Sequence, residues 1–188
     1  MGCVQMQYPV VHDDFSSFFD FLPIGAYRSH PDGTMLRANA ALVQINGYAT
    51  EAELLRSVRS IATEWYVQPG RRREFMRLLA RDGQVQGFVS EIHRHRSRER
   101  IWVREHAHVL RDTEGRVLCY EGTVEDISDL EHSRDQVDRI ADQVSGMVFR
   151  TVMLPDGSRR FTYVSRGVRE LLGLTPEQVM ADGNAIRR

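Results

Sequence analysis

The chain has 188 residues, of which 41% are hydrophobic and 27% charged, and its formal net charge is −1. This is the composition of an ordinary globular protein, and the length suits one domain of common size with part of another. Basic runs such as residues 71–73 and 93–96 have acidic residues nearby, and we interpret them as solvated faces. The charge therefore gives no support for a nucleic-acid partner.

The sequence also argues against export and membrane insertion. No apolar run reaches about 18 residues, so we predict no membrane segment. The N-terminus has no basic region followed by an apolar stretch, which argues against a signal peptide, and Met6 stands where myristoylation needs Ser or Thr. The two cysteines, Cys3 and Cys119, indicate neither a disulfide framework nor a zinc site. We therefore expect a cytoplasmic protein.

Short helices and a hairpin are expected in the first part of the chain. A helical stripe of apolar residues is formed by Phe15, Phe18, Phe19 and Leu22. Asp13 or Asp14 would cap this helix, and Pro23 would end it. The turn His-Pro-Asp-Gly at 30–33 predicts a hairpin. Asn39 is placed to cap a helix over 40–46, and Thr-Glu-Ala-Glu at 50–53 opens another helix as a capping box.

A longer helix follows an irregular stretch that ends at Gln68. Pro69 is expected to start this helix, and Asp82-Gly83 to end it. Its apolar side carries Phe75, Met76 and Leu79. We expect the core anchors of the irregular stretch to be Ile61, Trp65 and Tyr66.

Three consecutive strands are predicted over residues 85–96, 100–111 and 116–125. A two-residue loop at Ser97-Arg98 would pair Arg96 with Glu99. This register places on one face Phe88, Ile92, Ile101, Val103, Ala107 and Val109. The opposite face then carries Glu91, His93, His95, Arg100, Trp102, Arg104, His106 and His108. Because the two pairs of histidines are on the order of 13 Å apart along the strands, we expect no metal site.

A helix should follow the third strand. Ser-Asp-Leu-Glu at 128–131 is a second capping-box pattern, and the helix should run to about Val144. Its apolar positions have heptad spacing, which predicts a short two-stranded coiled coil. They are Leu130, Val137 and Val144, with Ser133, Ile140 and Met147 in the companion positions. The alternative is a surface helix that lies on its own sheet.

The beginning of the chain is repeated after this helix. Residues 146–157 resemble 25–33, Ser165 stands where Asn39 stood, and Gly173-Leu174-Thr175 matches Gly47 to Thr50. The offset stays between 124 and 126 residues, as in an internal repeat. The three strands have no second copy, so we expect the chain to be a piece of a longer protein.

These elements, taken in order, resemble the PAS sensory domain of bacterial signalling proteins. The best-matched segments are 69–79, Arg100-Ile-Trp-Val103 and Gly122-Thr-Val-Glu-Asp-Ile-Ser128. In the last of these Ser128 replaces the Thr of the family's Asp-Ile-Thr signature. The hairpin at 97–99 departs from the Asp-Gly turn that the family has there. We assign residues 13–128 to a PAS domain, 129–145 to a helical linker and 146–188 to an incomplete second PAS domain.

The resemblance implies an α+β fold in which a five-stranded antiparallel sheet, with helices on one face, encloses a small pocket. Candidate residues for lining this pocket are Tyr27, Tyr48, Trp65 and Phe75. Candidate residues for relaying a signal to the linker helix are Trp102, Gly122, Asp126 and Ser128. Asp126 could instead act only as a helix cap, and Trp102 as a solvent-facing strand residue.

The same resemblance weighs against two cofactors. Haem-binding PAS domains place a His on or next to the helix that Pro69 starts, and flavin-binding light sensors place a reactive Cys there in an Asn-Cys-Arg motif. Residues 68–82 contain neither. We therefore leave the cofactor unidentified and expect neither haem nor flavin.

We therefore expect a non-catalytic sensory module that binds a small ligand or partner. It would be a homodimer through its flanking helices and would relay its state through the linker helix. The resemblance implies an output domain such as a histidine kinase or a diguanylate cyclase, hence two-component or cyclic di-GMP signalling. A dimerisation spacer with a filled core is the alternative. No nucleophile-elbow, phosphate-loop or metalloprotease pattern occurs, so we expect no catalytic residues.

Overall fold

The computed structural model describes residues 15–182 and 186, and it divides into two compact units that meet after Ser128. The expected helix caps Asp13 and Asp14, together with Cys3, lie outside the described residues. Because the chain forms two units, the fold of each is given separately. In the described part of the chain, no helix is both long enough and apolar enough to cross a membrane.

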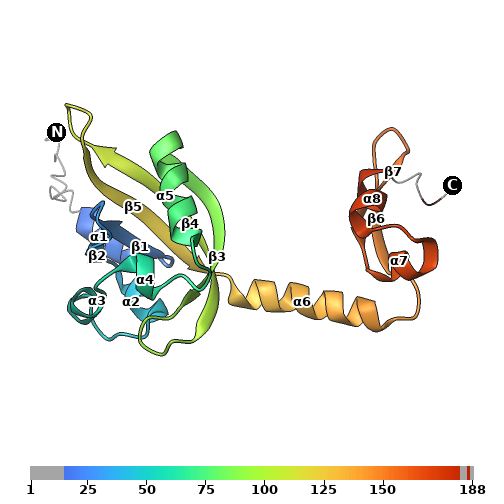
Figure 1. Ribbon diagram of the computed structural model, residues 1–188, viewed down its shortest axis with the longest axis horizontal. Helices are drawn as coiled ribbons and strands as arrows, with labels where there is room; N and C mark the ends of the chain where they lie inside the picture. Colours follow the sequence, from blue (N-terminus) through green and yellow to red (C-terminus); the bar gives the residue numbers. More distant parts are fainter. Residues whose placement is uncertain (1–14, 183–185, 187–188) are drawn as a thin grey trace, which may run out of the picture. The chain divides into compact units, whose positions relative to one another are not determined.

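The first unit is built on one antiparallel sheet of five strands in the order β2-β1-β5-β4-β3 (Figure 1). The strands are β1 (Gly25–Ser29), β2 (Met35–Ala38), β3 (Gln84–His93), β4 (Arg100–Arg111) and β5 (Val117–Asp126). The first hairpin and the three long strands lie within a few residues of their predicted positions. The α+β fold with a five-stranded antiparallel sheet is therefore confirmed.

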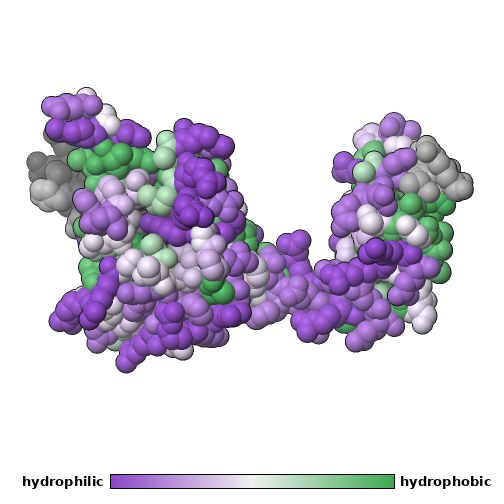
Figure 2. Space-filling view, in the orientation of Figure 1, coloured by the Kyte–Doolittle hydropathy of each residue, from purple (hydrophilic) through white to green (hydrophobic). Residues whose placement is uncertain are grey.

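Five helices accompany this sheet: α1 (Phe15–Phe21), α2 (Ala40–Ile45), α3 (Glu51–Ser57), α4 (Ile61–Glu64) and α5 (Arg71–Asp82). The predicted caps are present, since the Asn39 side chain accepts a hydrogen bond from the Leu42 amide and Thr50 from the Glu53 amide. Gly83, at φ 72°, ends α5 in the left-handed conformation that glycine adopts readily. The surface over α5 is mostly hydrophilic (Figure 2), as expected of a helix that buries one side.

The pairing of β3 with β4 differs from the predicted register by two residues. Glu91, and not His93, lies opposite Trp102, and His93 lies opposite Arg100. A shift of two keeps each side chain on its face, so the apolar face was predicted well. The loop is longer than predicted because residues 94–99 leave the ladder, with Arg98 at φ 62°.

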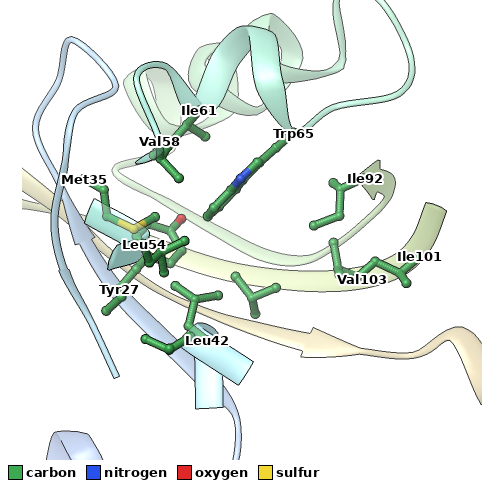
Figure 3. Close-up of a cluster of buried hydrophobic side chains, with 13 residues drawn as sticks. Tyr27, Met35, Leu42, Leu54, Val58, Ile61, Trp65, Ile92, Ile101 and Val103 are labelled. Atoms are coloured by element: carbon green, nitrogen blue, oxygen red, sulfur yellow. The ribbon is translucent and has the colours of Figure 1, made fainter. Parts of the chain in front are cut away.

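Two hydrophobic clusters fill the space between the helices and the sheet. The larger cluster brings Leu42, Leu54, Trp65 and further apolar residues of α2 to α4 against the strands (Figure 3). The smaller cluster contains Phe75, Leu79, Val85, Phe88 and Ala107. Tyr66 packs against both clusters. The boundary between them is where the polar interior described below is found.

The second unit contains helix α6 (Ser128–Gln143, which begins at the last residue of the first unit), the hairpin β6 (Phe149–Met153) and β7 (Arg159–Val164), and helices α7 (Gly167–Leu172) and α8 (Pro176–Ala181). Its small core is formed by Val164, Val168 and Val179. A complete capping box, formed by Thr175 and Gln178, opens α8.

Candidate functional site

An acidic residue lies on the core face of β4. Glu105 is only 4% exposed, and the residues two positions before and after it on the same face of the strand, Val103 and Ala107, belong to the hydrophobic clusters. The Tyr66 hydroxyl donates a hydrogen bond of 2.8 Å to the Glu105 carboxylate. Burial raises the pKa of Glu105, and the hydrogen bond from Tyr66 and the nearby Arg72 only partly offset this. The structure therefore holds a carboxyl group that is harder to ionise than one in water.

A buried cation lies close to this carboxyl group. The Arg72 residue of α5 is 9% exposed, and its guanidinium lies 5.1 Å from the Phe75 ring centre and 6.0 Å from that of Tyr66. The interpretation of residues 71–73 as a solvated face was wrong for two of the three. Arg71 stacks at 3.8 Å over the Phe88 ring and donates to the Val89 carbonyl, and only Arg73 is exposed.

Two hydroxyl groups complete what we call the polar seam, defined as Tyr27, Tyr66, Arg72, Ser90 and Glu105. Both Tyr27 and Ser90 are more than nine-tenths buried. Arg72 lies near the Tyr27 hydroxyl, and Ser90 lies near Glu105. Neither hydroxyl has a hydrogen-bond partner of good geometry among the described residues. Burial raises the pKa of Tyr27 and of Tyr66, so both stay protonated and can donate.

Gly122 of β5 gives Tyr27 its place in the seam. The two residues are paired across β1 and β5, and a Cβ on Gly122 would lie 2.7 Å from the Tyr27 hydroxyl oxygen. Gly122 was predicted to relay a signal. Its observed contacts indicate that it makes room for the Tyr27 ring.

The four candidate pocket residues are not gathered around one point. Tyr27 and Trp65 belong to the larger hydrophobic cluster, and Phe75 belongs to the smaller one. The indole nitrogen of Trp65 is buried with no hydrogen-bond partner among the described residues (Figure 3). Tyr48 lies apart from the seam, where its hydroxyl is 2.7 Å from Nδ1 of His95.

His95 does not lie on the outer face of the sheet, so its predicted placement was wrong. Its ring is held between Tyr48 and Glu64, with Nε2 2.7 Å from the Glu64 carboxylate. These three residues connect the end of α2, the end of α4 and the loop between β3 and β4. The long-range contacts also explain why that loop is longer than a two-residue turn. Among the described residues, no three His, Cys, Asp or Glu side chains converge as metal ligands would.

Three of the four candidate relay residues meet at the start of α6. The Asp126 carboxylate accepts hydrogen bonds from the Ser128 amide at 3.0 Å and from the Ser128 hydroxyl at 2.6 Å. The Ser128 hydroxyl in turn accepts from the Trp102 amide, and the Trp102 carbonyl accepts from the Ile127 amide. Ser128 was predicted to cap α6, but the side chain that accepts from the helix start is that of Asp126.

Arg94 ties this junction to the helical layer. Its guanidinium donates to the Asp126 carboxylate at 2.8 Å and to the Ile45 carbonyl, at the end of α2, at 2.7 Å. Arg94 thus links one oxygen of the Asp126 carboxylate to the end of α2, a helix that lies against the sheet. Asp126 therefore does more than cap a helix, because it joins α2 to the first turn of α6.

A separate pocket lies on the other face of the sheet, beside α1. Its volume is about 690 Å³, within the range of small-molecule sites. One wall is aromatic, with Phe18 and Phe19, and the other is polar, with Arg28, His108 and Glu121 among its residues. Glu121 already pairs with both Arg28 and His108. The charges on this face therefore largely neutralise one another.

The sheet order, the helices α2 to α5 on one face and the Asp-Ile-Ser junction define the PAS fold. A family model described as "PAS fold" matches residues 19–132, which is more than half of the chain. The chain belongs to this family. The match covers one PAS domain.

Comparison with solved structures agrees with this assignment. An RNA-binding light-oxygen-voltage receptor superposes with a TM-score of 0.57 at 18% identity, over 75% of this chain and 40% of the receptor's own length. A PAS domain from Colwellia psychrerythraea superposes with a TM-score of 0.52 at 13% identity, over 61% of this chain and 95% of that domain. At these identities the likeness shows the fold alone. No curated protein matches the sequence.

Sequence reasoning missed most of the polar seam. The only signal for Glu105 was strand alternation, which puts it on the face of Val103 and Ala107. Arg72 had no local signal, because it stands in a run of three arginines. Chemically, the seam offers hydrogen-bond donors from Arg72, Tyr27 and Ser90, and a carboxyl group that Tyr66 orients. Groups of this kind can form hydrogen bonds with a polar molecule.

Proposed function

We propose that the PAS domain is a sensor whose small ligand binds at the polar seam. One observation carries the proposal: Tyr27 and Ser90 bury hydroxyl groups without partners beside a buried carboxyl group and a buried guanidinium. Such groups cost free energy when left unsatisfied, about 1–3 kcal/mol each. A core that served only as a spacer would be more stable with apolar residues there. A ligand with hydrogen-bonding groups would offset the cost.

The signal would leave the domain through the junction at Asp126. Glu105 of the seam lies on β4 opposite Val124 of β5, two residues before Asp126. A ligand that changes the position of β4 against β5 would therefore act on the start of α6. The output domain, a histidine kinase or a diguanylate cyclase, is what the resemblance to bacterial sensors implies, and the domain itself is proposed to be non-catalytic.

Mass spectrometry of the purified chain under native conditions tests the sensor. We expect a copurified small molecule that is released on denaturation, and a smaller bound fraction in Tyr27→Phe and Ser90→Ala. Tyr163→Phe, which removes a hydroxyl from the second unit, is the matched control and should keep the bound fraction. If no small molecule copurifies and a metabolite library produces no thermal shift, the sensor proposal is wrong.

A second function, dimerisation, is favoured by exposed apolar side chains on the two flanking helices. On α1, Phe18 is 61% exposed and Phe21 84%. The residues of the predicted heptad that are about half exposed are Leu130, Val137 and Ile140 on α6 and Val144 just after it. We propose that a second copy of the chain covers them, with α6 forming a two-stranded coiled coil.

Light scattering after size exclusion tests the dimer at micromolar concentration. Val137→Asp should produce a monomer because it places a charge in the apolar seam of the coiled coil. His132→Asp, at a position of the same helix outside the heptad seam, should leave the dimer intact. A monomeric wild-type chain, or two variants of equal mass, would exclude the coiled coil.

We also propose that residues 146–188 are the start of a second PAS domain. Its support is that Ser165 repeats the contacts of Asn39. Each donates its backbone amide to the carbonyl of a residue at the start of its hairpin, and its side-chain oxygen accepts a hydrogen bond from the amide of that same residue. The amides are those of Ala26 and Val148. Ser165→Ala should therefore speed hydrogen exchange in the hairpin of β6 and β7, and unchanged exchange would contradict the equivalence.

A further inference from the structure

The guanidinium of Arg72 lies in the interior without a carboxylate partner. No Asp or Glu of the described residues lies within ion-pair distance, and its neighbours are the rings of Phe75 and Tyr66, the Tyr27 hydroxyl and, beyond ion-pair distance, Glu105. Buried charges in proteins are normally paired, because removal from water is costly. The arginines of the first unit that do make ion pairs are all at least partly exposed, and Arg71 and Arg94 are the least exposed of them.

The groups around Arg72 cannot replace the missing anion. Glu105 lies near Arg72 without forming an ion pair with it, its carboxylate already accepts from Tyr66, and burial makes it harder to ionise. The Tyr27 hydroxyl has no acceptor among the described residues, and Ser90 lies beside Glu105 without a well-formed hydrogen bond to it. The seam therefore has more donors than acceptors, and its one permanent charge is positive. Rings on the face of the guanidinium leave its N–H edges for a planar acceptor.

We propose that the ligand of the polar seam is a small carboxylate, whose carboxylate group pairs with Arg72 and accepts from Tyr27 or Ser90. This inference rests on the proposed function, because it names the chemical class of the same ligand. Two parallel hydrogen bonds from the guanidinium fork would fix the orientation of the carboxylate. The ligand must be small, because the seam lies between two packed clusters of large side chains.

Isothermal titration of the full chain tests the class directly. The probes are sodium acetate and sodium lactate, with acetamide and propane-1,2-diol as uncharged analogues and sodium chloride as the control for ionic strength. We expect the two carboxylates to bind and their affinity to fall at least about tenfold in Arg72→Gln, as for the loss of a bidentate ion pair. Arg73→Gln removes a neighbouring but exposed guanidinium and should bind as the wild type does.

A second variant keeps the test decisive if Arg72→Gln does not fold. Glu105→Gln removes the one side chain of the seam that can ionise to an anion and compete with the ligand for Arg72, so it should bind acetate at least as tightly as the wild type. If acetamide or propane-1,2-diol binds as well as its acid analogue, the carboxylate class is wrong and the sensor proposal stands. If neither carboxylate binds while a different copurified molecule is found, the carboxylate class is again wrong and the sensor proposal again stands. If the protein neither binds the probes nor carries a copurified molecule, both proposals fail.

Discussion

Gly122→Ala is expected to displace Tyr27 from the interior. A Cβ at this position would lie 2.6 Å from the His106 carbonyl oxygen and 2.7 Å from both Cζ and the hydroxyl oxygen of Tyr27. Alanine itself would favour a strand over glycine by roughly 0.5–1 kcal/mol. Forcing one extra methyl group into a packed core costs about 1–3 kcal/mol. Because one of the obstructing atoms belongs to the backbone of β4, we expect a net loss near 1–2 kcal/mol.

Urea denaturation followed by tryptophan fluorescence measures this loss. Both tryptophans, Trp65 and Trp102, lie in the first unit, so the signal reports that unit alone. Thr123→Ala, the next residue of β5, is the control and should change stability little. In a Tyr27→Leu background the cost of Gly122→Ala should shrink, because the ring is gone. A variant as stable as the wild type, or a cost unchanged by Tyr27→Leu, would refute the role given to this glycine.

Three further predictions concern buried or bridging polar groups. Glu105→Gln should remove a pH dependence of the free energy of unfolding. Because burial raises the pKa of Glu105, wild-type stability should fall as the pH rises from the unfolded-state pKa of about 4.3 through the folded-state pKa. Over that window the stability of the variant in urea unfolding should therefore rise relative to that of the wild type. A pH-independent difference would contradict this. Asn39→Ala should cost about 3 kcal/mol in the same assay, since it leaves the buried amides of Ala26 and Leu42 without their acceptor; a cost below about 1 kcal/mol would be too small. Asp126→Asn should weaken its pair with Arg94, which is partly exposed, by only about 0.5–1 kcal/mol, and should speed hydrogen exchange in the first turn of α6; unchanged exchange there would count against the junction.

The scaffold was predictable because its signals are local. The turn at 30–33, the Asn39 cap and the glycine at 83 each set a backbone conformation within a few residues, and all are found as expected. Strand alternation gave the faces of β3 and β4 even though their pairing was shifted by two. A shift of two is invisible to a rule whose period is two.

The loop and the polar interior were not predictable because their partners are distant in sequence. Arg94 and His95 leave the pairing of β3 with β4. Arg94 contacts Ile45, and His95 contacts Glu64 and Tyr48. No local sequence pattern predicts those contacts. The same holds for the polar seam, where α5, β1, β3 and β4 each contribute a residue to one place. Charged residues are exposed in most proteins, so the expectation of a solvated face for residues 71–73 followed the usual rule. Arg72 departs from it because of where α5 packs.

The seam and the exit junction lie on the same pair of strands, which makes their coupling testable without knowing the ligand. Glu105 is paired with Val124, and Val103 with Asp126. Tyr66→Phe removes the hydroxyl that holds Glu105, so it should let β4 shift and change hydrogen exchange at the amides of Ile127 and Ser128. Tyr120→Phe, on β5 but outside the seam, is the matched control. If both variants leave these two amides unchanged while Tyr66→Phe lowers stability, the seam is only structural, and a signal from it would need another route to α6.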